Sequence, residues 1–250
     1  MSFSPCAVIP HFNHSLAIAS VINDLREVGI DVLVVDDASQ VAHRERIDGM
    51  RCAGVRVVWR EVNGGKGAAV LDGLRAAWRL GYTHALQIDA DGQHNTRDIP
   101  ALLAKAKAHP DAIIAASPVF GSDAPLARIL GRKLTNFWVS VETLSLQMPD
   151  TMCGFRVYPL RQILALVGCC RFFRRMSFDI EIIVRSVWER IEIVSVPSAV
   201  TYPTDGLSHF RPFLDNVLIS ITHIRLVAGM VFRLPWFAAR RLAAAGDGVR

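Results

Sequence analysis

Residues 86–94 read Leu86-Gln87-Ile88-Asp89-Ala90-Asp91-Gly92-Gln93-His94, a short apolar run that ends in two carboxylates. Such a run, bounded by polar residues, predicts a buried strand. Side chains two residues apart point to the same face of an extended backbone, so Asp89 and Asp91 would project together from the carboxyl end of the strand. Mg²⁺ typically takes one or two protein carboxylates and keeps positions open for substrate phosphates. The pair therefore predicts a metal site, and the alternative is a solvated turn.

Three earlier apolar runs have the same organisation, because each ends in polar or glycine-rich residues. The four strands are expected at 6–9, 31–35, 55–59 and 85–88, and the segments that follow them are 10–14, 36–39, 61–66 and 89–94. Helices are expected between the runs, among them 15–28 and 68–80. Strict alternation with near-continuous apolar strands predicts an α/β fold whose mostly parallel sheet is covered on both faces. Ligands bind such sheets beyond the carboxyl ends of the strands, so the four loops predict one site.

The second half of the chain continues the alternation. A helix is expected over 98–109, a strand over 112–116, a loop over 117–125, a helix over 126–146, a turn and strand within 150–158, and a strand over 191–196 that Pro197 closes. We expect one domain over residues 1–210 and a distinct amphipathic helical tail over 211–250.

The tail contains an apolar stretch, 217–237, long enough to suggest a membrane span, since a span needs about 20 residues. His223, Arg225 and Arg233 interrupt it, and charges near a helix centre are costly in a bilayer. Pro235 is expected to break it. These features favour an amphipathic helix that lies in the membrane interface or packs on its own domain.

Composition restricts the partners. The chain has 250 residues, of which 51% are hydrophobic and 20% charged, as in a globular protein. A net charge of +5 attracts phosphates, and arginines beside aromatic residues in the second half favour a membrane surface over nucleic acid. An odd set of five cysteines without Cys-x-x-Cys spacing indicates reduced thiols, and the first residues lack secretory features. We expect a cytoplasmic protein, peripheral on the inner face of the cell membrane, and the sequence leaves its oligomeric state open.

Two further groups fit a nucleotide-diphosphate sugar. Asp36 and Asp37, at the end of the second strand, supply acceptors for a base and ribose, or alternatively cap the following helix. The 64–67 segment, Gly-Gly-Lys-Gly, offers backbone amides and Lys66 at a helix N-terminus for the diphosphate charge. It lacks P-loop spacing, and the alternative is an ordinary loop. The scattered histidines, His223 among them, lack zinc-ligand spacing and are expected to serve local hydrogen bonds.

Together these blocks resemble the family 2 inverting glycosyltransferases of GT-A fold. The blocks are Val8-Ile9-Pro10, Val34-Val35-Asp36-Asp37-Ala38-Ser39, Asn63-Gly64-Gly65-Lys66-Gly67, Asp89-Ala90-Asp91-Gly92-Gln93-His94 and the Gly154-Phe155-Arg156 segment. The nearest branch is the polyprenol-phosphate sugar transferases, of the dolichol-phosphate mannose synthase type. The resemblance covers roughly the first 160 residues.

The resemblance implies roles for individual residues. Pro10 and Asp37 would contact the nucleoside, Ala90 and Gln93 would line the donor pocket, and the carboxylates Asp89 and Asp91 would bind Mg²⁺ or Mn²⁺ on the diphosphate. The metal would act as a Lewis acid on the leaving nucleoside diphosphate. Inversion would need a single in-line attack on the anomeric carbon.

Three positions depart from the family pattern, and the two that lose a basic residue fall where the family handles phosphate. His14 stands where the family has an acid, Ser117-Pro118 where it often has an arginine, and His209 where it has a lysine. Arg128 and Arg132, one helical turn apart, are candidates to replace the missing charge, and the alternative is a solvated helix face.

A hydroxyl acceptor would need a general base, whereas a phosphate acceptor is already ionised. Asp179 and Glu181, flanked by apolar residues, are the candidate bases. The ordinary alternative for Asp179 is a cap for the helix that runs toward Trp188.

The sequence therefore predicts an inverting glycosyltransferase that moves a sugar from a UDP- or GDP-linked donor to a lipid-linked or amphipathic acceptor. A non-catalytic nucleotide-sugar-binding protein remains open because charged acceptor-side residues are missing. A sugar-1-phosphate nucleotidyltransferase is disfavoured because the first loop, 10–14, contains no glycine.

Overall fold

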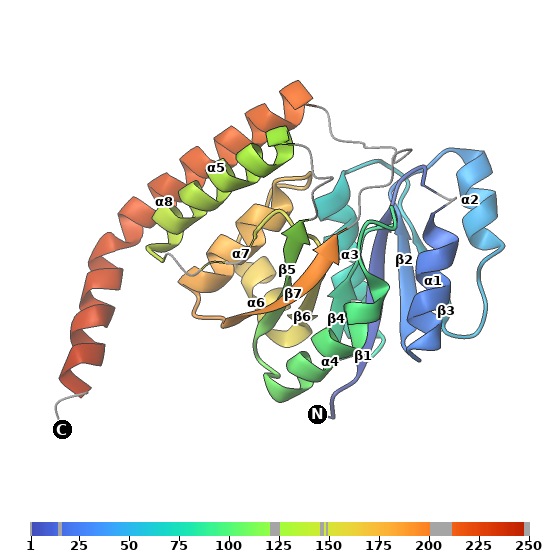
Figure 1. Ribbon diagram of the computed structural model, residues 1–250, viewed down its shortest axis with the longest axis horizontal. Coiled ribbons are helices and arrows are strands. Elements are labelled where there is room, and N and C mark those ends of the chain that lie inside the picture. The colour runs from blue at the N-terminus through green and yellow to red at the C-terminus, as the bar shows by residue number, and fades with distance from the viewer. Residues whose placement is uncertain are drawn as a thin grey trace.

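One mixed sheet forms the centre of the molecule, and helices cover both of its faces (Figure 1). The computed structural model describes residues 2–14, 17–120, 126–145, 148, 150–200 and 212–247. Within them the sheet has seven strands: β1 Pro5–His11, β2 Asp31–Asp36, β3 Val55–Trp59, β4 His84–Gln87, β5 Ile113–Phe120, β6 Arg156–Pro159 and β7 Ile193–Val200. Their order across the sheet is β3-β2-β1-β4-β6-β5-β7, and β6 alone among these runs antiparallel to its neighbours. The predicted mostly parallel α/β sheet is confirmed.

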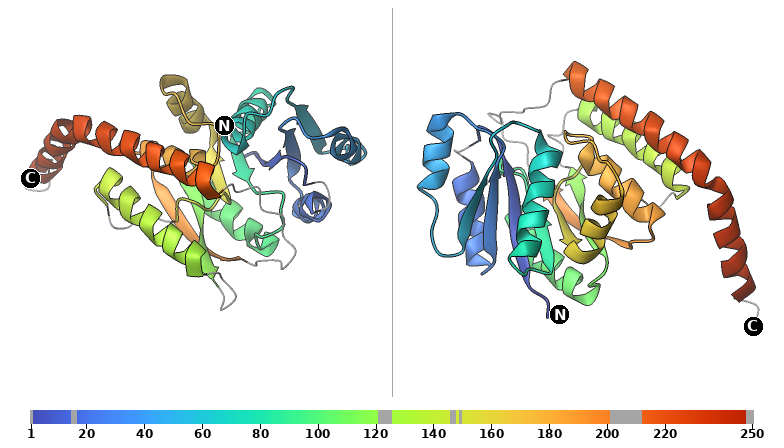
Figure 2. Two further views of the ribbon diagram at one scale, coloured as in Figure 1. Left: turned by 90° about the horizontal axis from the view of Figure 1, so that it is seen from above. Right: turned by 180° about the vertical axis from the view of Figure 1, so that it is seen from behind.

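The helices divide between the two faces of the sheet. They are α1 Ile18–Glu27, α2 Val41–Asp48, α3 Lys66–Arg79, η1 Thr96–Asp98, α4 Ile99–Ala108, α5 Leu126–Thr143, α6 Leu160–Cys169, α7 Phe178–Trp188 and α8 Pro212–Asp247. Helices α1 and α4 lie on one face of the sheet, and α3, α6 and α7 lie on the other (Figure 2). Apolar side chains of the first pair belong to one buried cluster and those of the second group to another, and a third cluster joins α5, α7 and α8. Gly73 brings α3 close to the sheet, because a Cβ there would lie 2.4 Å from Cγ1 of Val8.

Two strands extend beyond their expected ends. Residues 117–120 were expected in a loop but continue β5, and β7 runs through Pro197 to Val200. Ser117 pairs with Pro197, and Pro118 pairs with Ser198. The prolines are tolerated because β7 is an edge strand and because β6 pairs with β5 only at Ile114 and Ala115, before Pro118 is reached.

The expected break of the C-terminal helix at Pro235 is also wrong, because α8 continues to Asp247. Proline removes one backbone donor and crowds the preceding turn, which can bend a helix without ending it. Figure 1 shows that α8 bends along its length. Before the bend, α8 lies beside α5 and buries Ile219, Leu226 and Met230 against Val139 and Trp188. The first half of the tail is therefore packed on the domain.

Segment Leu214–Phe237 of α8 has the length and hydropathy of a membrane-crossing helix, with a mean hydropathy of 1.7. About 28% of its most apolar window is buried inside the protein. Among the described residues it is the one helix that meets these criteria, which core helices of soluble proteins can also meet.

Candidate active site

The loops that follow β1 to β4 meet at one wall of a cavity of about 1190 Å³. Predicted donor residues line this wall: Pro10, Asp37, Lys66, Asp89, Ala90, Asp91 and Gln93. The opposite end of the cavity lies between α5 and α8, where Trp138, Ile219 and Val227 contribute apolar surface. The strand-end loops thus share a site with two helices that are distant in sequence.

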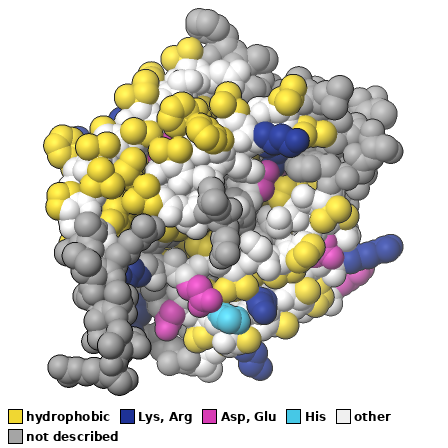
Figure 3. All heavy atoms as spheres, turned by 60° about the vertical axis from the view of Figure 1, so that its left-hand side comes forward, with side chains coloured by type: hydrophobic (Ala, Val, Ile, Leu, Met, Phe, Trp, Pro, Cys, Tyr) yellow, Lys and Arg dark blue, Asp and Glu magenta, His cyan; other side chains and the backbone are white. Residues whose placement is uncertain are grey.

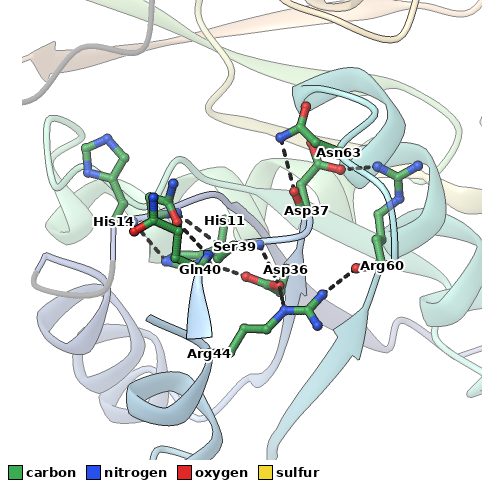
Figure 4. Close-up of polar contacts among 10 residues, drawn as sticks. His11, His14, Asp36, Asp37, Ser39, Gln40, Arg44, Arg60 and Asn63 are labelled. Atoms are coloured by element: carbon green, nitrogen blue, oxygen red, sulfur yellow. Dashed lines mark hydrogen bonds and ion pairs between the residues drawn. The ribbon is translucent and has the colours of Figure 1, made fainter. Parts of the chain in front are cut away.

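Asp36 lies beneath this wall and does not line the cavity (Figure 4). Its carboxylate accepts hydrogen bonds from His11 Nδ1 at 3.0 Å, the Ser39 amide at 3.1 Å and Arg44 Nε at 2.9 Å. The His11 Nε2 atom accepts the His14 amide, which places the ring proton on Nδ1. Burial alone would raise the pKa of Asp36, but the hydrogen bonds outweigh it and lower the pKa to about 2. The geometry therefore gives Asp36 a structural role in place of the expected donor contact.

Asp37 anchors the glycine-rich loop. Its carboxylate accepts the amides of Gly64 at 2.9 Å and Gly65 at 2.7 Å, and it also contacts Arg60 (Figure 4). Gly65 has a φ of +87°, and a Cβ there would lie 2.8 Å from Cγ of Arg175. The Ala68 amide of α3 donates to Gly65 O at 3.0 Å and to Arg174 O at 2.9 Å. Of the 64–67 amides that were expected to face a diphosphate, those of Gly64 and Gly65 donate to Asp37 instead.

Lys66 joins two carboxylates at the cavity wall. Its Nζ lies 2.8 Å from Asp89 Oδ2 and 2.8 Å from Asp179 Oδ2. Burial alone would lower the pKa of Lys66, but Asp179 and Asp89 outweigh it and raise the pKa. For Asp89, burial opposes ionisation, yet Lys66 and His94 hold its pKa below the usual range. Lys66 therefore carries its positive charge at the position where negative donor phosphates were predicted.

The carboxylates fit a hard divalent cation. Asp89 Oδ1 is buried and has no hydrogen-bond partner among the described residues, so one ligand position stays open beside the Lys66 contact. Burial, and then the charge of Asp89, raise the pKa of Asp91. No group of three His, Cys, Asp or Glu side chains suited to a metal occurs in the described part of the chain. An ion here would need further ligands from substrate phosphates or water, as Mg²⁺ sites commonly do.

Gly154 leaves room for this cluster. A Cβ at this position would lie 2.6 Å from Lys66 Nζ, 2.7 Å from Gln87 Nε2 and 3.1 Å from Asp89 Oδ2. Gln87 in turn donates to Asp179 Oδ1 at 3.2 Å and accepts from the Tyr158 hydroxyl at 3.1 Å. Gly154 of the Gly-Phe-Arg segment therefore packs directly against Lys66, Gln87 and Asp89, where a larger residue would collide with them.

Neither Asp179 nor Glu181, the candidate general bases, lines the cavity. The Asp179 carboxylate is occupied by Lys66 and Gln87. Glu181 accepts the Phe173 amide at 2.7 Å and Arg185 Nε at 2.8 Å, which ties the 172–175 segment to α7. Ser177 holds the N-cap position of α7, so Asp179 lies in the first turn and not at the cap. Both carboxylates are buried, and each forms hydrogen bonds and an ion pair with neighbouring segments.

Of the residues predicted to bind the acceptor, the structure places one, Arg132, at the cavity. Arg132 lines the cavity, and its Nη1 lies 2.8 Å from Asp150 Oδ1. The side chain of Arg128 and the whole of His209 lie outside the described residues. Pro118 lies on β5 in a regular pairing with β7.

Sequence reasoning missed a second group of cavity residues on α5, α8 and the segment before α7. Trp138, Arg175, Met176, Asp215 and His223 all line the cavity. Glu142, behind them on α5, is fully buried and contacts His223. The sequence did contain one signal for this group, namely the polar residue His223 within the apolar stretch 217–237. A histidine that is buried in an apolar helix needs a hydrogen-bond partner, so a second polar residue could have been expected near it.

Solved structures with the same arrangement define the class of the fold. Glucosyl-3-phosphoglycerate synthase from Mycobacterium tuberculosis, in complex with Mn²⁺, UDP and glucosyl-3-phosphoglycerate, superposes with a TM-score of 0.68 over 91% of this chain and 80% of that chain. Its sequence identity is 16%, so the likeness concerns the fold. The fold is that of the GT-A glycosyltransferases.

The family follows from sequence comparison. The model of glycosyl transferase family 2 matches residues 6–180, and the chain belongs to this family. An undecaprenyl-phosphate mannosyltransferase from Micrococcus luteus is 28% identical over 207 residues, which cover 76% of this chain and 80% of the relative. A polyprenol monophosphomannose synthase from Mycolicibacterium smegmatis is 27% identical over 210 residues, covering 80% and 78%. The chain is thus a glycosyltransferase, in line with the predicted branch, and the two alternative functions are set aside.

Proposed function

We propose that this protein transfers a sugar, with inversion, from a nucleotide-diphosphate donor to a polyprenol-phosphate-like acceptor at a membrane surface. The observation that carries the proposal is the shared cavity, which connects the polar strand-end loops to an apolar groove between α5 and α8. A polar donor and an amphipathic acceptor fit its two ends. The names of the two relatives given above specify polyprenol-type acceptors, which supports the same acceptor class here.

At the donor end, Pro10, Asp37, Ala90 and Gln93 form the wall on which we place the nucleoside and sugar. Asp36 fixes the loop that presents Asp37, and is a positioning residue. Asp89 and Asp91 would hold Mg²⁺ or Mn²⁺, which supplies Lewis-acid stabilisation of the departing diphosphate. Lys66 adds a fixed positive charge beside them, so the site can balance the charge that develops on the leaving group.

At the acceptor end, an acceptor that is already ionised is favoured, because both candidate bases are engaged elsewhere. Asp179 and Glu181 are each held in an ion pair, and neither lines the cavity. A phosphate monoester needs no deprotonation before it attacks the anomeric carbon, whereas a hydroxyl does. Arg132 and Arg175 line the cavity and supply positive charge for such a phosphate.

An apolar surface on α5 and α8 supports the membrane location. Figure 3 shows hydrophobic side chains gathered on the face that contains these helices. Large apolar side chains exposed there are Leu130, Leu134 and Phe137 of α5 and Ile221, Ile224, Val231, Phe232 and Trp236 of α8. Such a patch on a soluble domain marks an interaction surface. We place α8 in the interface of the cytoplasmic leaflet, with its N-terminal half packed on the domain.

A ligand screen followed by a transfer assay tests this function. Purified protein is heated with UDP-, GDP- or dTDP-sugars, with and without Mn²⁺, and the donor is expected to raise the melting temperature only when metal is present. Radiolabelled sugar from that donor should then enter a polyprenyl-phosphate product on vesicles. Donor stabilisation without transfer to any prenyl phosphate would overturn the acceptor part, and stabilisation by no nucleotide sugar would overturn the whole proposal.

A further inference from the structure

A buried carboxylate–imidazole pair lies at the acceptor end of the cavity. His223 of α8 is 7% exposed and lines the cavity, and Glu142 of α5 is fully buried behind it. His223 Nδ1 and Glu142 Oε1 are 2.7 Å apart. The two residues are 81 positions apart in sequence, so the pair exists only because α8 packs on α5.

The surroundings of the pair are otherwise apolar. Val139, Ile219 and Leu226 of the third buried cluster lie on the same two helices, and the Trp138 ring lies 6.5 Å from the His223 ring. The Trp188 indole donates to the backbone carbonyl of Glu142 at 2.9 Å, which fixes the turn that carries it. A charged pair in such surroundings is costly to desolvate and contributes little to stability compared with well-packed apolar residues.

One polar atom of each partner is left unsatisfied. His223 Nε2 and Glu142 Oε2 are buried, and neither has a hydrogen-bond partner within the described residues. Burial raises the pKa of Glu142, while His223 opposes that rise. Because Nδ1 is directed at the carboxylate, Nε2 is the ring atom left for a ligand.

Three charged residues line the cavity in addition to those of the strand-end loops. They are Arg132, which is paired with Asp150, together with Arg175 and Asp215. An occupant of this end must therefore match an apolar groove that also contains cationic and hydrogen-bond-donating groups. A prenyl chain that carries a phosphate has both properties, whereas a free sugar or an apolar lipid has only one of them.

We propose that His223 donates a hydrogen bond from Nε2 to the phosphate of the prenyl-phosphate acceptor, and that Glu142 is the positioning residue that orients the ring. This assignment rests on the proposed function. It gives the acceptor phosphate a ligand on α8, a helix in which family motifs identify no site residue.

The test compares His223→Gln and Glu142→Gln with the wild-type protein, with farnesyl phosphate as acceptor. His223→Gln removes the imidazole and is expected to raise the KM for farnesyl phosphate by roughly tenfold, as for loss of a hydrogen bond to a charged group. Glu142→Gln should raise it less. Donor KM and donor-induced thermal stabilisation should stay within about twofold of wild type in both variants, which separates acceptor binding from misfolding.

His109→Gln is the matched control, because His109 also faces an acid, Glu192, at 3.6 Å but lies outside the cavity. Its KM values should equal those of wild type. An unchanged farnesyl phosphate KM in His223→Gln would overturn the inference while leaving the proposed function intact. A wild-type protein that neither binds donor nor transfers sugar would instead overturn the proposed function.

A second measurement on the unmodified sequence removes the dependence on folding of a variant. In protein labelled with ¹⁵N-histidine, farnesyl phosphate is expected to shift the Nε2 resonance of His223, with no comparable change at His109. An equal shift with inorganic phosphate would overturn the assignment to the lipid acceptor and indicate a general phosphate site. Transfer to farnesol, with kcat and not KM lowered in His223→Gln, would overturn it in favour of a base for a hydroxyl acceptor.

Discussion

The two ends of the cavity are constructed in different ways. At the donor end, short polar segments directly after β1 to β4 provide the wall, and their side chains are bonded to one another through Asp36, Asp37 and Lys66. At the acceptor end, residues from the long helices α5 and α8 provide an apolar wall with a few polar atoms. The donor end is therefore held by hydrogen bonds and ion pairs among its own loops, whereas the acceptor end depends on how α8 packs on α5. Under the proposed function, fixed charge at the first end would serve the donor, and the apolar surface at the second would serve a prenyl chain.

The sharpest test of this comparison removes the predicted metal ligand Asp91. Asp91→Asn should lower kcat by about a thousandfold, because Lewis-acid stabilisation of the leaving group is worth several kcal/mol. Acceptor binding should be unaffected. Mn²⁺-dependent turnover and farnesyl phosphate binding by calorimetry provide the two measurements, and Asp48→Asn, at an exposed ion pair with Arg51, is the control. Wild-type turnover in Asp91→Asn would show that the two ends are not divided as described.

The opposite test changes the exposed part of α8 without touching the donor end. Phe232 is 86% exposed, and Phe232→Asp should lower partition onto anionic vesicles by roughly tenfold to a hundredfold, the effect of losing one inserted aromatic side chain. Turnover on soluble farnesyl phosphate should not change. Vesicle sedimentation measures the partition, and Val41→Asp, at a 70% exposed position on α2, is the control. Equal vesicle binding by both variants would contradict the interfacial placement of α8.

Sequence motifs predicted which donor-end residues would lie close together, because these residues follow directly after neighbouring strands. The strand before Asp89, the acid pair after β2 and the lysine before α3 are each readable within a window of a few residues. The sequence did not indicate which side chains and amides from distant segments would form hydrogen bonds and ion pairs with one another. Lys66 forms an ion pair with Asp179, which lies on another helix. Asp37 accepts a hydrogen bond from the Gly64 amide, which had been expected to face a phosphate. Those pairings depend on three-dimensional approach, for which residue spacing contains no signal.

The acceptor end was predicted less well for the same reason. Arg132 was found from its helical spacing, but the two best-placed side chains, Glu142 and His223, meet across 81 residues. The apolar character of α8 correctly predicted an amphipathic helix, yet composition could not distinguish the half that packs on α5 from the half that extends beyond it. Similarly, Pro197 and Pro235 were read as terminators, although an edge strand and a bent helix accommodate them.

A smaller effect is expected where the donor end is packed most closely. Gly154→Ala would place a methyl group 2.6 Å from Lys66 Nζ and 2.7 Å from Gln87 Nε2, so the charged cluster must shift. We expect a loss of about 1–3 kcal/mol in the free energy of unfolding, as for other overpacked sites, together with weaker donor binding. Urea denaturation measures the first and thermal shift with donor the second. Gly168→Ala on α6 is the control, since a Cβ at that position would have no neighbouring atom within 4 Å; similar effects of both substitutions would mean that the cluster tolerates displacement.

The smallest expected effect concerns the stability that Asp36 gives the donor end at low pH. Its pKa of about 2 in the folded protein lies below the ordinary value of 3.8, so its ionised form stabilises the folded state. This contribution is fully present above about pH 4 and is lost as the pH falls through 2, with a size of about 2 kcal/mol. The difference in unfolding free energy between wild type and Asp36→Asn should therefore shrink between about pH 4 and pH 2, when urea denaturation is measured in steps across that interval. The exposed Asp48→Asn should give a nearly constant difference, and a constant difference for Asp36→Asn as well would mean that hydrogen bonding to His11 and Arg44 does not depend on the charge of Asp36.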